Sequence, residues 1–181
     1  MSLTSLLAPT FSQMLGAMAG WLEVAARDGD ADALMGARLA PDMFPLAAQV
    51  GLACYQPWEA VSLLGGEPLP ADAVAMRASA ATAGERPGTV AEARARIDAA
   101  VAMLDELGPS DLDGHGGSPV RLALPNGMVF DMTADQYARD WALPQFYFHT
   151  DMAYAILRGR GVALGKRDYV GHMFRYSRAS G

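Results

Sequence analysis

Apolar residues recur at every third or fourth position in four long stretches of the chain, a spacing that predicts amphipathic helices. In the first stretch Phe11, Leu15 and Met18 follow this rhythm. Asp42 is the expected N-cap of the second helix, and Thr89 opens the third as the first residue of a capping box. The four predicted helices cover about residues 5–27, 43–64, 90–107 and 143–158.

A single histidine lies within the apolar pattern of the last predicted helix. His149 shares a face with Gln145, Met152, Ala153 and Ile156, because residues three or four apart project from the same side of a helix. A histidine in this position is either a packed, hydrogen-bonded core residue or part of a binding site. The residues alone leave both interpretations open.

The segments between the helices complete the predicted architecture. Residues 67–88 are rich in Pro, Gly and Ala, and they predict a long connection with one turn of helix at residues 73–76. Asn126-Gly127 lies between two short runs that alternate in polarity, residues 120–124 and 128–132, which predicts a β-hairpin.

Together these elements predict an all-α fold, a four-helix bundle with a long crossover connection and one small β-hairpin before the last helix. We expect a single domain over residues 1–171, followed by a C-terminal tail over residues 172–181 that includes His172. His115 lies between two glycines and is interpreted as an exposed loop residue.

Composition and charge exclude several classes of function. A net charge of −6 argues against a nucleic-acid-binding protein, and the basic residues between Arg158 and Arg175 are interpreted as a solvated surface. Cys54 is the only cysteine, so neither an intramolecular disulfide nor a thiolate metal cage can form. The first residues lack the features of a signal peptide, and no run approaches the roughly 20 apolar residues of a membrane span. We therefore expect a cytoplasmic protein that does not bind membranes.

Two stretches resemble a known family. One is residues 38–46, which read RLAPDMFPL, and the other is LPQFYFH at residues 143–149, followed by residues 153–158 and 165–168. Together they resemble an uncharacterised, domain-of-unknown-function branch of the DinB/YfiT-like bundles, over nearly the whole chain. The resemblance implies a four-helix bundle that is often dimeric. Better-known members of that superfamily bind a divalent metal through three histidines, and some resemble thiol-dependent transferases or isomerases.

The metal pattern that the resemblance implies is incomplete in this sequence. Its position on the second helix falls at about Gln49, and its His-x-x-x-His pair falls at His149 and Ala153. Residues four apart on a helix can hold one ion, but a zinc or nickel site needs three or four good ligands. Only His149 remains as a metal ligand, so we expect a degenerate metal site and no cofactor.

The sequence leaves three functions open. Our first hypothesis is a bundle that binds a small molecule near His149 and Gln49, which should face each other across its centre. Tyr147, Tyr154 and Arg38 are further candidate ligand-binding residues. The alternatives are a metal-dependent, thiol-transferase-like enzyme that uses His149, and a non-catalytic structural dimer. We expect a homodimer, and the sequence identifies no substrate.

Overall fold

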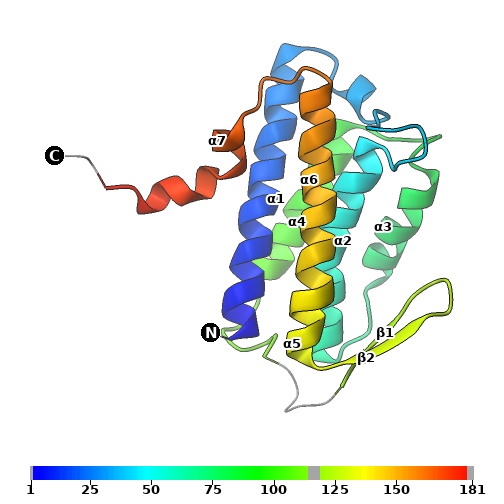
Figure 1. The fold of residues 1–181 in the computed structure, drawn as a ribbon, viewed down its shortest axis with the longest axis vertical. Coiled ribbons are helices and arrows are strands. Elements are labelled where there is room, and N and C mark those ends of the chain that lie inside the picture. The colour runs from blue at the N-terminus through cyan, green and yellow to red at the C-terminus, as the bar shows by residue number, and fades with distance from the viewer. Residues whose placement is uncertain (1, 114–118, 179–181) are drawn as a thin grey trace.

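Four long helices form the body of the protein in the computed structural model, which describes residues 2–113 and 119–178 (Figure 1). They are α1 (Leu3–Asp28), α2 (Leu46–Gly65), α4 (Val90–Asp105) and α6 (Leu143–Gly159). The predicted all-α bundle is confirmed. Its core is continuous and includes the fully buried side chains of Leu7, Phe11, Trp21, Leu46, Ile97 and Phe146.

The ends of two of the helices show how local sequence sets their limits. At α4 the predicted capping box is present, because Thr89 Oγ1 accepts from Glu92 N and Glu92 Oε2 accepts from Thr89 N. The prediction for α2 is wrong: its N-cap is Pro45, and Asp42 is an exposed turn residue. A residue before proline is disfavoured in helical conformation, so Phe44 cannot join the helix and α2 begins only at Leu46.

The long connection after α2 contains more structure than its sequence predicts. Residues 71–82 form a complete helix, α3 (Ala71–Thr82), which packs beside α2, rather than a single turn (Figure 1). Its apolar stripe is inconspicuous because the two buried positions, Ala73 and Ala80, are both alanines. Alanine has the highest helix propensity, so composition favoured a helix where the apolar periodicity was weak.

The predicted hairpin is present at one end of the bundle. Strands β1 (Val120–Ala123) and β2 (Val129–Met132) pair antiparallel, with Arg121 opposite Asp131. After the hairpin, α5 (Ala134–Tyr137) and the π-helical η2 (Ala138–Ala142) continue directly into α6. One further short element, the 3-10 turn η1 (Asp32–Leu34), lies between α1 and α2. The prediction for His115 lies outside the described residues.

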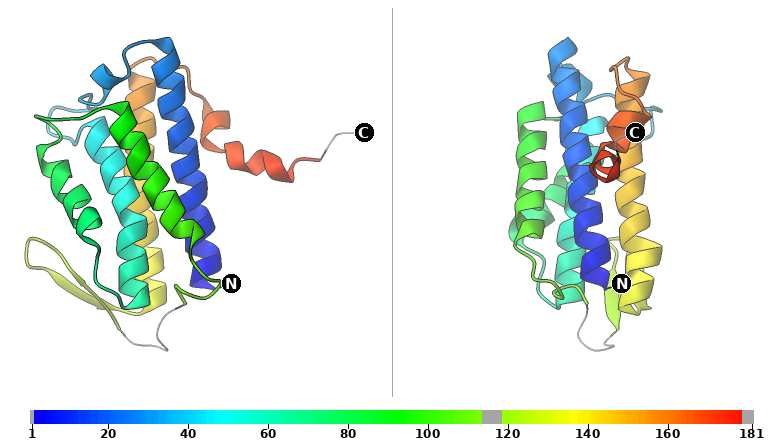
Figure 2. Two further views of the ribbon diagram at one scale, coloured as in Figure 1. Left: turned by 180° about the vertical axis from the view of Figure 1, so that it is seen from behind. Right: turned by 90° about the vertical axis from the view of Figure 1, so that its left-hand side faces the viewer.

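The chain beyond α6 packs against α1 and then leaves the body. Helix α7 (Lys166–Tyr169) is fixed by Trp21, whose Nε1 donates to Asp168 O at 3.1 Å and whose ring stacks on Tyr169. The last element, η3 (Gly171–Tyr176), points away from the bundle (Figures 1 and 2). Within the described residues, no helix is both long enough and apolar enough to cross a membrane.

Candidate functional site

The structure brings His149 and Gln49 together between α2 and α6, which run in opposite directions (Figure 1). His149 Nδ1 lies 2.8 Å from Gln49 Oε1, and only 7% of His149 and 1% of Gln49 is exposed. Gln49 Nε2 in turn donates to the carbonyl oxygen of Phe44 at 3.4 Å. The sequence-based expectation that the two side chains face each other is confirmed.

This arrangement assigns the protons of the imidazole. Because the Gln49 amide gives its N–H to Phe44, its oxygen faces His149, and Nδ1 must therefore carry a proton and donate it. Burial lowers the pKa of His149 to about 4, so the ring is neutral at pH 7. A neutral ring that is protonated at Nδ1 leaves Nε2 as a hydrogen-bond acceptor.

The other three predicted ligand-binding residues do not join this pair. Tyr154 packs edge-on against Trp21, with ring centroids 5.2 Å apart, on the side of α6 that faces α1. Tyr147 is at the surface, and burial together with Asp151 raises its pKa. Arg38 Nη1 donates to the carbonyl oxygen of Met43 at 2.6 Å, so it supports the loop before α2.

The residues at this position do not fit the three-ligand metal site that the sequence resemblance implies. His149 Nδ1 is engaged by Gln49, and Ala153 has no donor atom. Among the residues that the structure describes, no three His, Cys, Asp or Glu side chains are grouped so that they could hold an ion. His172 lies on η3, beyond the bundle.

A second polar cluster lies towards the hairpin, between α2 and the α5–η2 stretch that leads into α6, and sequence reasoning missed it. Its centre is Glu59 on α2, of which 6% is exposed. Oε1 accepts from the Tyr55 hydroxyl at 2.8 Å, while Oε2 accepts from Trp141 Nε1 at 2.8 Å and from the Tyr137 hydroxyl at 3.3 Å. Burial and the nearby Glu59 raise the pKa of both tyrosines, which therefore remain hydroxyl donors.

One signal in the sequence could have revealed this cluster. Glu59 is the only charged residue in the twenty-residue helix α2, within an otherwise uncharged and mostly buried run. A carboxylate is rarely buried unless hydrogen bonds satisfy it, so a lone Glu in such a run predicts buried donors nearby. Which donors they are could not be read from the sequence, because Tyr137 and Trp141 are about eighty positions away.

The Glu59 cluster forms one wall of a surface pocket of about 320 Å³ between α2, α3 and β1. Two guanidinium groups line it, those of Arg77 and Arg121. Arg77 Nη1 donates to the Tyr55 hydroxyl at 3.3 Å, and its charge lies 5.5 Å from the centre of the Tyr55 ring. The pocket is completed by the apolar side chains of Leu63, Leu69 and Leu122 and by a second carboxylate, Glu67.

A neighbouring pocket of about 520 Å³ shares Ser62, Glu67 and Pro68 with it and extends to residues 107–112, which follow α4. Its walls are mainly apolar and include Trp58 and Leu107. Neither His149 nor Gln49 lines either pocket. The enclosed space and the predicted histidine site are therefore at different places along α2.

The fold and its polar interior define a DinB-like helical bundle. The chain resembles the crystal structure of a DinB family member protein from Shewanella denitrificans, with a TM-score of 0.75 and 28% sequence identity. That match covers 99% of this chain and 94% of the other. The predicted family resemblance is confirmed.

The chain also matches a family that is narrower than the DinB-like bundles as a whole. Residues 3–170 match the domain of unknown function DUF1993, and the chain belongs to this family. No curated protein matches the chain. The family match covers the whole bundle, including Gln49, Glu59 and His149, and ends directly before η3.

Proposed function

We propose that this protein binds a small molecule at the His149–Gln49 pair. The observation that supports this proposal is the 2.8 Å contact between His149 Nδ1 and Gln49 Oε1, because it turns the other ring nitrogen, Nε2, away from Gln49 and no described residue bonds to it. One half-exposed aromatic ring, that of Phe148, lies beside the pair. Phe148 contacts the imidazole edge-on with centroids 5.3 Å apart, and Phe44 supplies the carbonyl that orients Gln49. A ligand with a hydroxyl or N–H donor and an apolar part suits these groups.

Binding of small molecules to the wild-type protein and to His149→Ala tests this proposal. Ligand-observed NMR with a library of small hydroxyl- and amine-bearing aromatic compounds should find binders that the variant no longer recognises. His172→Ala is the matched control, because it removes a histidine outside the bundle and should bind as the wild type does. A set of binders that is the same for all three proteins would contradict the proposal.

The Arg77 pocket supports a second ligand position, for a different class of molecule. Arg77 and Arg121 have no carboxylate within ion-pair distance among the described residues, and the leucine side chains provide apolar walls. A guanidinium group recognises carboxylate and phosphate by paired hydrogen bonds. The ligand that suits this pocket is therefore a small organic anion. Binding of phenylphosphate and benzoate should be weakened in Arg77→Gln but not in Arg86→Gln, which changes an exposed arginine outside the pocket.

Metal analysis separates this proposal from the enzyme alternative. Protein purified without an affinity tag should contain no stoichiometric zinc or nickel, because His149 has no second strong ligand beside it. Stoichiometric metal that disappears in His149→Ala would favour the thiol-transferase-like enzyme instead, and thiol substrates would then be tested.

A further inference from the structure

The pocket of about 520 Å³ beside the end of α2 is not used by either of the ligand positions proposed above. Most of its wall is apolar, and the side chains of this part are Trp58, Val61, Pro68, Pro70, Leu107 and Leu112. A pocket of this size can enclose a small organic molecule, since ligand pockets in proteins range from about 300 to 1,000 Å³. Its occupant should therefore have an apolar body.

The charged groups in this wall are all negative. Glu67 and Asp111 line the pocket, and no lysine, arginine or histidine of the described chain does. Both residues are exposed, and neither has a basic side chain within ion-pair distance in the part of the chain that the structure describes. Asp111 Oδ2 accepts a hydrogen bond from Gly108 N at 2.9 Å, which holds its carboxylate at the loop after α4. The pocket therefore presents negative charge beside an apolar wall.

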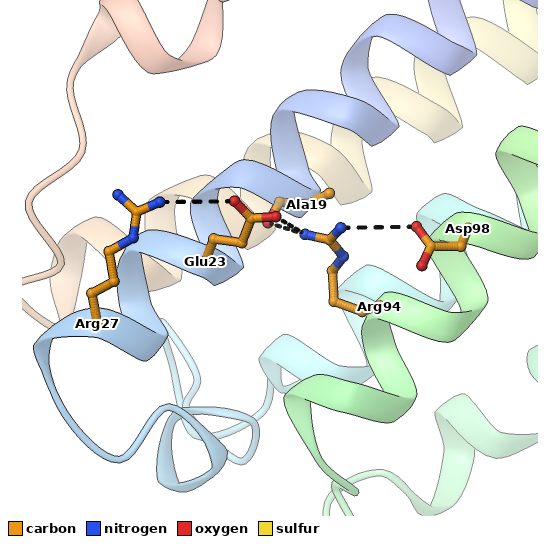
Figure 3. Close-up of polar contacts among 5 residues, drawn as sticks. All are labelled: Ala19, Glu23, Arg27, Arg94 and Asp98. Atoms are coloured by element: carbon orange, nitrogen blue, oxygen red, sulfur yellow. Dashed lines mark hydrogen bonds and ion pairs between the residues drawn. The ribbon is translucent and has the colours of Figure 1, made fainter.

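A groove of about 500 Å³ between α1 and α4 shows the contrast, because two of its carboxylates are already paired (Figure 3). Arg94 forms ion pairs with Glu23 and, at 4.0 Å between Nη2 and Oδ1, with Asp98. Arg27 Nη2 lies 4.0 Å from Glu23 Oε2 on the other side. These guanidinium groups take the place that a cationic ligand would need. The described wall of the Trp58 pocket contains no such internal cation.

The ends of two helices add to the negative potential of the pocket. Helix α2 ends at Gly65, which lines the pocket, and α4 ends at Asp105, two residues before Leu107. The C-terminal end of a helix carries a partial negative charge, which nearby cations stabilise. Neither of these fully described helices has a basic residue in its last turn. A cation in the pocket would compensate both helix dipoles.

Trp58 supplies the aromatic part of the wall. The face of an indole ring attracts an ammonium group more strongly than the other aromatic side chains do. Trp58 Nε1 is buried and has no hydrogen-bond acceptor among the described residues, so no polar contact of its own fixes the orientation of the ring. Trp58 can therefore contact both the apolar body and the charge of a ligand.

We propose that this pocket binds an apolar amine, whose ammonium group faces the carboxylates of Glu67 and Asp111 and whose hydrocarbon part covers Trp58. The apolar wall, the unpaired carboxylates and the two uncompensated helix ends all favour an organic cation. The neighbouring Arg77 pocket, which shares Glu67, has the opposite charge preference. Binding of the amine requires neither the His149–Gln49 pair nor Arg77.

Isothermal titration calorimetry on the full-length protein tests this site with two probes, phenethylamine and phenethyl alcohol. The two molecules share one apolar body and differ in charge. We expect the amine to bind at least about tenfold more tightly than the alcohol, and its affinity to fall as the salt concentration rises. No binding of the amine at about 1 mM, or equal affinities for the amine and the alcohol, would overturn the proposal.

A conservative substitution of Glu67 tests the role of the charge. Glu67→Gln should weaken binding of phenethylamine about threefold, whereas Glu85→Gln, which changes an exposed glutamate outside the pocket, should not. Because Glu67 also lines the Arg77 pocket, Glu67→Gln should leave phenylphosphate binding unchanged or strengthen it, which a general loss of structure would not do. Unchanged affinity for the amine in Glu67→Gln would contradict the proposal.

Three further variants locate the amine. Trp58→Leu keeps an apolar side chain but removes the ring, and it should weaken binding of phenethylamine. His149→Ala and Arg77→Gln, which alter the two other ligand positions, should bind the amine as the wild type does. Loss of amine binding in His149→Ala but not in Trp58→Leu would place the amine at the histidine pair and refute the proposal for this pocket.

Discussion

Two buried polar clusters include residues of α2, one where it packs against α6 and one where it packs against the α5–η2 stretch, and they differ in how their hydrogen bonds are used. The carboxylate of Glu59 accepts from three neutral donors, and both of its oxygens are engaged. The His149–Gln49 pair uses one nitrogen of the imidazole and leaves the other as an acceptor. A satisfied cluster stabilises the packing of the helices, whereas an unsatisfied acceptor is available for recognition.

Removing the Glu59 carboxylate should have the largest effect. Glu59→Ala leaves the Tyr55, Tyr137 and Trp141 donors without their acceptor, and we expect the free energy of unfolding to fall by about 3–5 kcal/mol. Urea denaturation followed by circular dichroism measures this change. Glu67→Ala is the control, because Glu67 lines the same pocket but is exposed, and it should change stability by less than about 0.5 kcal/mol. Equal effects of the two substitutions would mean that the cluster does not stabilise the interface.

The second-largest expected effect is the loss of stability in acid that the His149–Gln49 pair causes. The pKa of His149 is about 4 in the folded protein and about 6.5 when exposed in the unfolded chain, so the unfolded state binds more protons between these values. Stability is therefore lost as the pH falls from about 6.5 to 4, by about 2–3 kcal/mol from this residue.

A comparison with His149→Gln isolates that contribution, since acidic residues titrate in both proteins. Unfolding free energies measured from pH 7 to pH 4 should decline less steeply in the variant, whereas His172→Gln should follow the wild type. Identical pH dependence of the wild type and His149→Gln would show that the imidazole keeps an ordinary pKa in the fold.

The smallest expected effect concerns the link between the Glu59 cluster and its pocket. Tyr55→Phe removes one donor to Glu59 and the acceptor of Arg77, and we expect a loss of about 1 kcal/mol in stability. Because Arg77 loses its anchor, the affinity for phenylphosphate should fall as well. Tyr176→Phe removes an equally polar group from η3, outside the pocket, and should change neither stability nor binding of the anion. Unchanged affinity in Tyr55→Phe would separate the pocket from the cluster.

Local sequence determined most of the helices and the start of α4. The capping box at Thr89 and the Asn-Gly turn of the hairpin act over a few residues, so their structures followed from the sequence. Prediction from the sequence failed where helical periodicity was weak and where a proline displaced the start of a helix. Helix α3 buries alanines and shows little periodicity, and Pro45 moved the start of α2 away from Asp42.

The two buried polar sites also differ in how far the sequence predicted them. The apolar face around His149, together with the resemblance to the family, was enough to predict its pairing with Gln49. Only the tertiary structure decided which side chains surround Glu59, since its donors Tyr137 and Trp141 come from a distant part of the chain. Helical periodicity determines which face of an element is buried, but the partners of a buried group depend on how the helices pack together. The sequence therefore determined the bundle and the His149–Gln49 pair, and packing decided the Glu59 cluster.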